Sequence, residues 1–304
     1  MSAKLNPLER VETTLELWSQ RFDAELERLL RPGSGRDVPA KLAEAMRYTA
    51  LAPGKRLRPY LTCTCCRLVG GQEQDALSAA AAIECVHAFS LIHDDLPSMD
   101  DDARRRGQPS NHVRFGEGMA VLAGDALLTL AFELLASDPT SPERSRRTVL
   151  ELAQACGWAG MIGGQVDDTE TAPHTRDRDL LDSIRGRKTG RLMAAACRIG
   201  AICGCATAGA VESLGCYGLQ LGIAFQVADD LLDVAPREAG VGSDLQPTDG
   251  AGGNKQTRPG CVGSVEVRRQ AHESVEQAIA ALESWGPEAD ELRTIARFVI
   301  ERKS

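Results

Sequence analysis

Residues 76–102 read ALSAAAAIECVHAFSLIHDDLPSMDDD, an apolar run that ends in a cluster of aspartates. Within residues 76–92 the apolar side chains recur at the spacing of an α-helix, and the helix-favouring residue Ala predominates. Ionised carboxylates at the end of a buried segment are costly unless positive groups meet them. The stretch therefore predicts a buried helix that carries Asp94, Asp95 and the aspartates after them to a cation-binding site.

The rest of the chain continues this helical pattern. Further Ala- and Leu-rich segments with helical spacing cover residues 8–30, 40–51, 118–136, 149–163, 178–203, 211–234 and 265–282. Aromatic residues make up only 4% of the 304 residues, which favours helix packing over a β-sandwich. No repeat or compositional boundary divides the chain, so we expect one all-α domain over residues 1–304. The Gly- and Pro-rich residues 235–263 are expected to form a flexible loop.

Composition excludes several classes of function. Asp and Glu outnumber Lys and Arg by 43 to 35, so nucleic acid is a poor candidate partner. We find neither an uninterrupted run of about 20 apolar residues nor a signal-peptide pattern, and therefore expect a cytoplasmic protein without a membrane span. The ten cysteines include one C-x-x-C pair, Cys63 and Cys66, but no second pair completes a zinc site. We expect reduced structural thiols.

A second acidic cluster, FQVADDLLD at residues 225–233, also ends an apolar run. Asp229 and Asp233 are four residues apart and share one face of a helix. Grouped carboxylates suit Mg²⁺, whose other positions are filled by water or phosphate, whereas the spacing of a calcium-binding EF-hand is missing. A single aspartate run is usually a solvated turn. Two such clusters, each after an apolar helix, favour a metal site.

Basic residues form a complementary set at PGKRLRP (53–59), Arg104–Arg106 and RGRKTG (185–190). Arg and Lys match the geometry and charge of phosphate groups. His87 lies seven residues before Asp94, on the same helical face and two turns away. Taken one by one, such cations could simply complement helix ends. Together with the acidic clusters they indicate two bound anions, one held by metal and one by cations.

Six blocks in order resemble one known family: GKRLRP (54–59), DDLPSMD with RRG (94–107), FGEGMAVLAGDAL (115–127), GGQVDD (163–168), KTG (188–190) and FQVADDLLD (225–233). The chain resembles the bacterial short-chain trans-prenyl diphosphate synthases, most closely the farnesyl diphosphate synthases. The resemblance implies the isoprenoid synthase fold, a bundle of about ten helices around a deep central cavity, paired as a homodimer.

The implied activity is the condensation of isopentenyl diphosphate with an allylic diphosphate, first dimethylallyl and then geranyl, to give farnesyl diphosphate. Alternatives with the same chemistry are a geranylgeranyl or geranyl diphosphate synthase. A regulatory subunit that resembles these synthases is a non-enzymatic alternative. A terpene cyclase would leave the second set of cations unexplained, because it binds only one diphosphate.

The resemblance also implies a role for each matching residue. A Mg²⁺ cluster would be held by Asp94, Asp100 and Asp229, with Asp95, Asp230 and Asp233 assisting. The allylic diphosphate would contact Arg105, Lys188 and Gln226, while Lys188 and Thr189 would steady the allylic cation. Isopentenyl diphosphate would be held by Lys55, Arg58, His87 and Arg106. Phe89, five residues before the first aspartate, would form the floor that limits product length.

The sequence departs from the family pattern at two places. Ala103 and Arg104 follow the first aspartates where the family usually has Asp and Leu. A diphosphate-binding lysine usual in the loop after Asp233 is missing, and Arg237 or Lys255 are the candidates to replace it.

Overall fold

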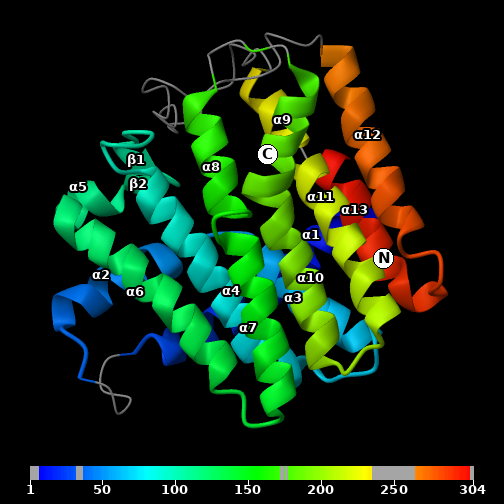
Figure 1. Ribbon diagram of the computed structural model, residues 1–304, viewed down its shortest axis with the longest axis horizontal. Helices are drawn as coiled ribbons and strands as arrows, with labels where there is room; N and C mark the ends of the chain where they lie inside the picture. Colours follow the sequence, from blue (N-terminus) through cyan, green and yellow to red (C-terminus); the bar gives the residue numbers. More distant parts are fainter. Residues whose placement is uncertain (1–6, 32–36, 172–174, 176, 235–263, 302–304) are drawn as a thin grey trace, which may run out of the picture.

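The computed structural model describes residues 7–31, 37–171, 175, 177–234 and 264–301, and their fold is an all-α bundle (Figure 1). The elements are α1 (Pro7–Leu29), α2 (Ala40–Ala50), α3 (Leu57–Leu68), α4 (Glu73–Asp94), β1 (Arg104–Arg105), β2 (Gln108–Pro109), α5 (Asn111–Phe115), α6 (Glu117–Ala136), α7 (Pro142–Cys156), α8 (Met161–Glu170), α9 (Arg178–Arg185), the π-helix η1 (Gly186–Gly190), α10 (Arg191–Cys203), α11 (Ala208–Val234), α12 (Ser264–Ala280), the 3-10 helix η3 (Pro287–Ala289) and α13 (Asp290–Glu301). The predicted fold class is confirmed. The loop expected at residues 235–263 lies outside the described residues.

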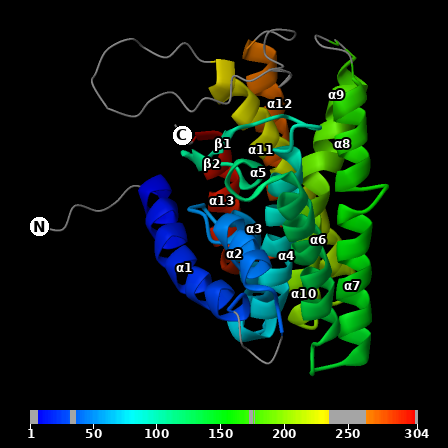
Figure 2. The same cartoon turned by 90° about the vertical axis from the view of Figure 1, so that its left-hand side faces the viewer.

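Helix α4 occupies the centre of the bundle. It packs against α3, α6 and α10, while α10 also contacts α7 and α11, and α11 contacts α12. Figure 2 shows α1 on one side of the molecule and α7 and α8 on the opposite side. Small apolar side chains cover α4 on several faces, as expected of a helix that is buried all round.

The two ends of α4 are defined by the sequence. At the start, the side chains of Gln72 and Asp75 form a reciprocal capping box. At the end, the Asp100 N–H donates to the Asp94 carbonyl at 2.9 Å, and Asp101 adopts a left-handed φ of 52°. The chain therefore turns back at the end of α4 and keeps the aspartates of the first motif close together.

The structure corrects the predicted elements in the middle of the chain. The helix expected over residues 149–163 is two helices, α7 and α8, separated by a turn at Gly157–Gly160. Helix α7 also begins earlier than expected, because Ser141 caps it and Pro142 occupies its first turn. Helices α3, α5 and α13 were not predicted. The strands β1 and β2 form a two-residue antiparallel pair that alternation could not reveal.

Two helices of the bundle are long and strongly apolar. By length and composition alone, α4 and α6 could cross a membrane. The core helix of a soluble protein passes the same test, so the absence of a membrane span stays a prediction. Most of the apolar window of α4 is buried inside the bundle, as in a core helix, but less than half of that of α6 is.

The described cysteines agree with the prediction of reduced structural thiols. Nine are free, and seven of these are buried. Burial raises the pKa of Cys156 to about 11 and that of Cys85 to about 12. Such thiols are protonated at neutral pH and behave as small apolar groups.

Candidate active site

The first acidic motif lies where α4 ends. The pKa of Asp94 is raised to about 6, mainly by burial. The charge of Lys188 opposes this shift, as does that of Arg105, while those of Asp100 and Asp95 add to it. A carboxylate removed from water in this way is costly to keep ionised unless a positive charge meets it. The end of α4 is therefore a place where an added cation would be stabilised.

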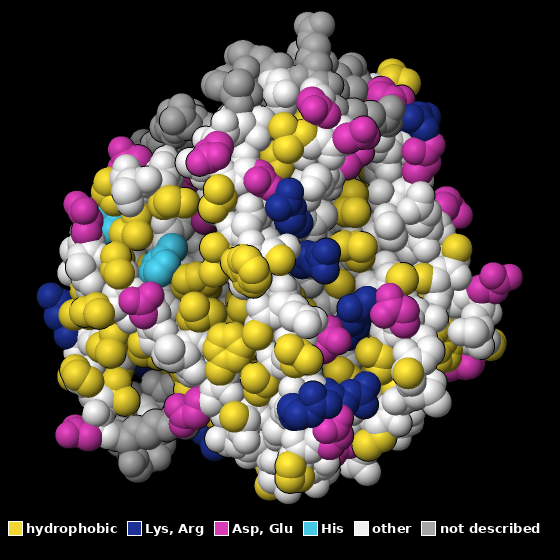
Figure 3. All heavy atoms as spheres, in the orientation of Figure 1, with side chains coloured by type: hydrophobic (Ala, Val, Ile, Leu, Met, Phe, Trp, Pro, Cys, Tyr) yellow, Lys and Arg dark blue, Asp and Glu magenta, His cyan; other side chains and the backbone are white. Residues whose placement is uncertain are grey.

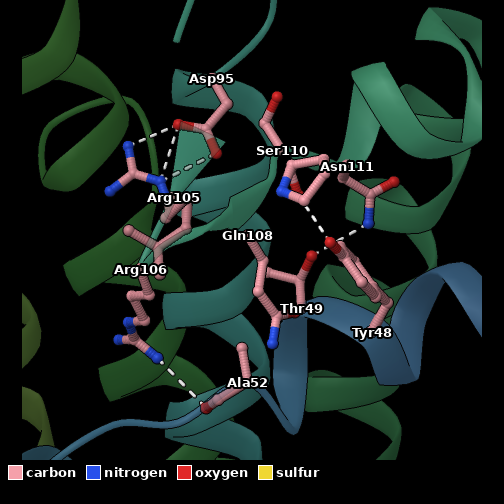
Figure 4. Close-up of a pocket in the computed structure, with 11 residues that line it drawn as sticks. Tyr48, Thr49, Ala52, Asp95, Arg105, Arg106, Gln108, Ser110 and Asn111 are labelled. Atoms are coloured by element: carbon pink, nitrogen blue, oxygen red, sulfur yellow. Dashed lines mark hydrogen bonds and ion pairs between the residues drawn. The ribbon is translucent and has the colours of Figure 1, made fainter. Parts of the chain in front are cut away.

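An arginine holds the second aspartate of each motif. The Arg105 Nε donates to both carboxylate oxygens of Asp95, at 2.7 and 2.8 Å (Figure 4). In the second motif, the Arg185 Nη2 donates to the Asp230 Oδ2 at 2.9 Å. Asp95 and Asp230 are only 2% and 8% exposed, and the preceding residue in each motif is more accessible. Both second aspartates are thus paired with arginine, and their role in assisting the metal stays a prediction.

Cationic side chains from α3, β1 and the residues next to them lie near His87, which is half-buried on α4. Burial lowers the pKa of His87 well below 6.5, and the positive charges of Arg58, Arg106, Arg56 and Arg105 lower it further. Arg105 is paired with Asp95, and Arg56 with Asp23 and Glu84, so the uncompensated positive charge near this neutral imidazole comes mainly from Arg58 and Arg106. The surroundings of His87 are suited to an anion.

The positive charges of two of these arginines, Arg58 and Arg106, are not fully compensated by carboxylates. The Arg58 Nε is buried and has no hydrogen-bond partner within the described ranges. Burial lowers the pKa of Arg58, and Arg106 lowers it too, although Glu84 and Asp229 oppose the shift. The Arg106 Nη1 donates to the Ala52 carbonyl at 3.3 Å (Figure 4). An anion between the two guanidinium groups would relieve their repulsion.

Arg56 and Lys55 differ from Arg58 and Arg106 in their surroundings. Arg56, which the sequence groups with the other cations, has a left-handed φ of 47° and is buried. It forms salt bridges with Asp23 at 2.7 Å and with Glu84 at 2.6 Å, so it joins α1 and α4 to the connection before α3. Lys55 is exposed beside it. Arg56 therefore fixes the loop that carries Lys55 and the start of α3, which carries Arg58.

The KTG segment lies in the π-helix η1, against α11. A Cβ atom at Gly222 would lie 2.7 Å from the Gly190 Cα, so only glycine allows α11 to approach η1 this closely. One turn further along α11, the Gln226 Oε1 accepts a hydrogen bond from the Thr189 hydroxyl at 2.9 Å. The Gln226 Nε2 donates to the Asp230 Oδ1 at 3.0 Å. A continuous hydrogen-bonded chain thus links the second acidic motif to Thr189.

Lys188 lies between α8 and the first acidic motif. Its Nζ donates to the Asp168 Oδ2 at 2.8 Å. Burial disfavours the charged ammonium, but Asp168, Asp94 and Asp100 outweigh this effect and raise the pKa of Lys188. Asp168, for which the sequence indicated no role, is therefore a partner of a predicted site residue.

Phe89 is buried at the contact between α4 and α6. Its ring lies edge-to-face with that of His93, with 4.8 Å between centroids. The His93 Nε2 lies 3.1 Å from the carbonyl oxygen of Val121 on α6. Phe89 is thus held one turn before the first aspartates.

The donor groups fit Mg²⁺, although they do not form a complete site by themselves. In the part of the chain that the structure describes, no three His, Cys, Asp or Glu side chains form a ready-made metal site. Magnesium needs only one or two carboxylates when substrate phosphates and water supply the other ligands. Asp94, a buried carboxyl group close to Asp100, fits this requirement. The side chain of Asp233, and the whole of Arg237 and Lys255, lie outside the described residues.

Fold and site together define a class of protein: an all-α protein in which a carboxylate-rich site and an arginine-rich site share one central helix, suited to two anionic groups. Comparison with known proteins identifies the family within this class. A family model described as Polyprenyl synthetase matches residues 39–257. The chain belongs to this family of trans-prenyl diphosphate synthases.

Its relatives include synthases of more than one product. Farnesyl diphosphate synthase of Escherichia coli K12 is 40% identical over 296 residues, which cover 95% of this chain and 97% of that protein. The putative geranylgeranyl pyrophosphate synthase 8 of Arabidopsis thaliana is 45% identical over 255 residues, covering 81% of this chain and 70% of the relative. The apo crystal structure of an FPP/GFPP synthase from Zymomonas mobilis has a TM-score of 0.80 and 38% identity, and covers 96% of this chain and 99% of the other.

Proposed function

We propose that this chain is a Mg²⁺-dependent farnesyl diphosphate synthase, which joins isopentenyl diphosphate to dimethylallyl and then geranyl diphosphate. The observation that carries this proposal is the division of α4 between two sites. Asp94 lies at the C-terminal end of α4, close to Asp100 in the turn that follows. Two turns earlier on the same helix, His87 lies among arginines. Two diphosphates bound there would lie side by side.

The allylic diphosphate would bind at the acidic site. Mg²⁺, when held by Asp94, Asp100 and Asp229 with Asp233 assisting, would stabilise the negative charge of the diphosphate as its C–O bond breaks. Arg105 and Lys188 are already charged, so their positive charge needs no proton transfer during the reaction.

The allylic cation would be steadied by Thr189 and Gln226. The Thr189 hydroxyl donates its proton to the Gln226 Oε1. The Thr189 oxygen therefore keeps its lone pairs for a cation, and a dipole fixed in advance costs little reorganisation. Asp230 holds the Gln226 amide in this orientation by accepting from its Nε2.

Isopentenyl diphosphate would bind at Lys55, Arg58, His87 and Arg106. A neutral His87 can donate one hydrogen bond to a phosphate oxygen, and the anion would offset the repulsion among the arginines. The double bond of isopentenyl diphosphate attacks the allylic carbon, a C–C bond forms, and the allylic diphosphate leaves. The new cation then loses a proton, which we assign to the departing diphosphate rather than to a side chain.

Product length is the finer part of the proposal. A buried aromatic ring at Phe89 supports farnesyl diphosphate, because a bulky floor would stop growth at C15. The near full-length similarity to the Escherichia coli farnesyl diphosphate synthase is in keeping with this product. The similarity to geranylgeranyl pyrophosphate synthases favours the C20 product as the second candidate.

We also propose a cytoplasmic homodimer that forms through α6 and its neighbours. Apolar side chains gather in the middle of the face that α6, α7 and α8 present (Figure 3). They include Val121 and Leu122 on α6, Leu150 on α7, and Trp158, Ile162 and Val166 around α8. A second copy of the chain would cover this surface and the exposed side of α6, in place of a membrane. We further propose that residues 1–304 form a single domain.

Primer specificity tests the function. Purified protein is incubated with Mg²⁺, isopentenyl diphosphate and a C5, C10 or C15 allylic diphosphate, and the products are sized. We expect C15 product from the C5 and C10 primers and none from the C15 primer. A C20 product would instead identify a geranylgeranyl diphosphate synthase. No product from any primer would favour the regulatory subunit.

A further inference from the structure

The GGQVDD segment on α8 has no role in the function proposed above, yet it packs closely against the KTG segment. A Cβ atom at Gly164 would lie 2.6 Å from the Lys188 backbone nitrogen. Real Cβ atoms do not approach a backbone atom this closely, so only glycine lets α8 lie directly on η1. The glycine thereby brings the acidic residues one turn later, Asp167 and Asp168, to the side chains of η1.

Two adjacent ion pairs join α8 to η1. The Asp168 Oδ2 accepts from the Lys188 Nζ at 2.8 Å, and the Asp167 Oδ2 lies 2.5 Å from the Arg187 Nη2. All four side chains are about one quarter to one third exposed. The two pairs are thus alike in burial, and Lys188 in addition interacts with the aspartates of the first motif.

More than one carboxylate interacts with the Lys188 ammonium group. It has a flexible four-carbon stem, and a point charge of this kind imposes no geometry of its own. Both Asp94 and Asp100 attract it electrostatically. A direct ion pair between Lys188 and either aspartate would occupy carboxylate oxygens that Mg²⁺ requires and would have to break before substrate binds. The contact with Asp168 keeps the ammonium on the α8 side instead.

We propose that Asp168 is a positioning residue, which holds Lys188 beside the first acidic motif so that its charge is available to the allylic diphosphate. The proposal rests on the function assigned above and adds the role of the GGQVDD segment. Asp168 touches neither the reacting atoms nor the metal in this account. It acts only through Lys188.

Binding of geranyl diphosphate tests this role independently of turnover. The dissociation constant is measured by calorimetry with Mg²⁺ present and isopentenyl diphosphate absent, for the wild type and for Asp168→Asn. A hydrogen bond to a charged group is typically worth enough to change affinity about tenfold, so we expect weakening on the order of tenfold. Asp168→Glu, which keeps the charge, should recover most of the affinity. The matched control is Asp167→Asn, which breaks the neighbouring ion pair on the same helix and should leave affinity within about twofold.

A double-mutant cycle with Lys188→Met separates positioning from a general structural effect. If Asp168 acts through Lys188, Asp168→Asn has no further effect in the Lys188→Met background. In Asp168→Asn, the Michaelis constant for geranyl diphosphate should rise, and that for isopentenyl diphosphate should stay constant.

Three results would overturn the proposal: additive effects of the two substitutions, an equal effect of Asp167→Asn, or unchanged affinity in Asp168→Asn. Circular dichroism of each variant shows whether it is folded. A wild type that binds geranyl diphosphate but forms no product would contradict the proposed function, while the binding cycle would still decide the role of Asp168.

Discussion

At the scale of single residues, the environment of His87 has a consequence for stability. The folded state lowers the pKa of His87 below 6.5, through burial and the charges of Arg58, Arg106, Arg56 and Arg105. When the pH falls below 6.5, the unfolded chain takes up a proton at His87 that the folded chain does not. Protonation therefore favours the unfolded state, and the contribution of His87 to stability decreases as the pH falls.

His87→Gln should remove this contribution, because Gln does not titrate. We expect the wild type to lose more stability than His87→Gln between pH 7 and pH 5.5, as measured by urea unfolding without substrate. The other histidines are common to both proteins, so their effects cancel in the comparison. Parallel pH dependences would show that the arginines around His87 do not resist its protonation.

A second residue-scale prediction concerns Phe89. If its ring is the floor that limits the product, Phe89→Ala opens space below the first aspartates and should lengthen the main product from C15 to C20. His93, whose ring contacts Phe89, stays unchanged in this variant. The check is the product distribution of the purified variant with geranyl diphosphate as primer. A distribution like that of the wild type would remove Phe89 from this role.

At the scale of elements, the ion pair between Arg185 and Asp230 joins the end of α9 to α11. Both side chains are almost completely buried. Removing one partner of a buried pair leaves an uncompensated charge, so Arg185→Met should destabilise the fold by about 3–5 kcal/mol. The measurement is the free energy of unfolding in urea.

The charge-matched double variant is the control for this prediction. Replacing Asp230 by Asn together with Arg185→Met removes the unpaired carboxylate charge of Asp230. The double variant should therefore recover part of the lost stability. A double variant less stable than Arg185→Met would contradict the interpretation that an unpaired Asp230 causes the loss.

The elements also show what the sequence could and could not predict. Helical spacing identified α1, α2, α4, α6, α11 and α12 with nearly correct ends, because long amphipathic or apolar runs leave little ambiguity. It merged α7 with α8, since the break at Gly157–Gly160 depends on a backbone turn within a helix-favouring run. Spacing also placed Asp94 and His87 on one face of α4. It could not show that Asp95 and Asp230 pair with arginines, because Arg105 and Arg185 reach them only through tertiary packing.

At the scale of the whole molecule, the apolar surface on α6 predicts association. Leu122 is 56% exposed on α6, and an aspartate there would place a charge at the centre of the proposed interface. We expect the wild type to be a dimer by light scattering and Leu122→Asp to be a monomer. Leu17→Asp is the control, because Leu17 is 60% exposed on α1, outside the proposed interface. If both variants remain dimers, or if the wild type is a monomer, α6 is not the interface.

The central claim is that two separate sites on the chain bind two different diphosphates. Calorimetry with Mg²⁺ tests it most directly, by titrating Asp94→Asn and Arg58→Met with geranyl diphosphate and, separately, with isopentenyl diphosphate. We predict that Asp94→Asn loses affinity mainly for geranyl diphosphate and Arg58→Met mainly for isopentenyl diphosphate, each by about tenfold or more. Equal losses for both ligands in either variant would contradict the account.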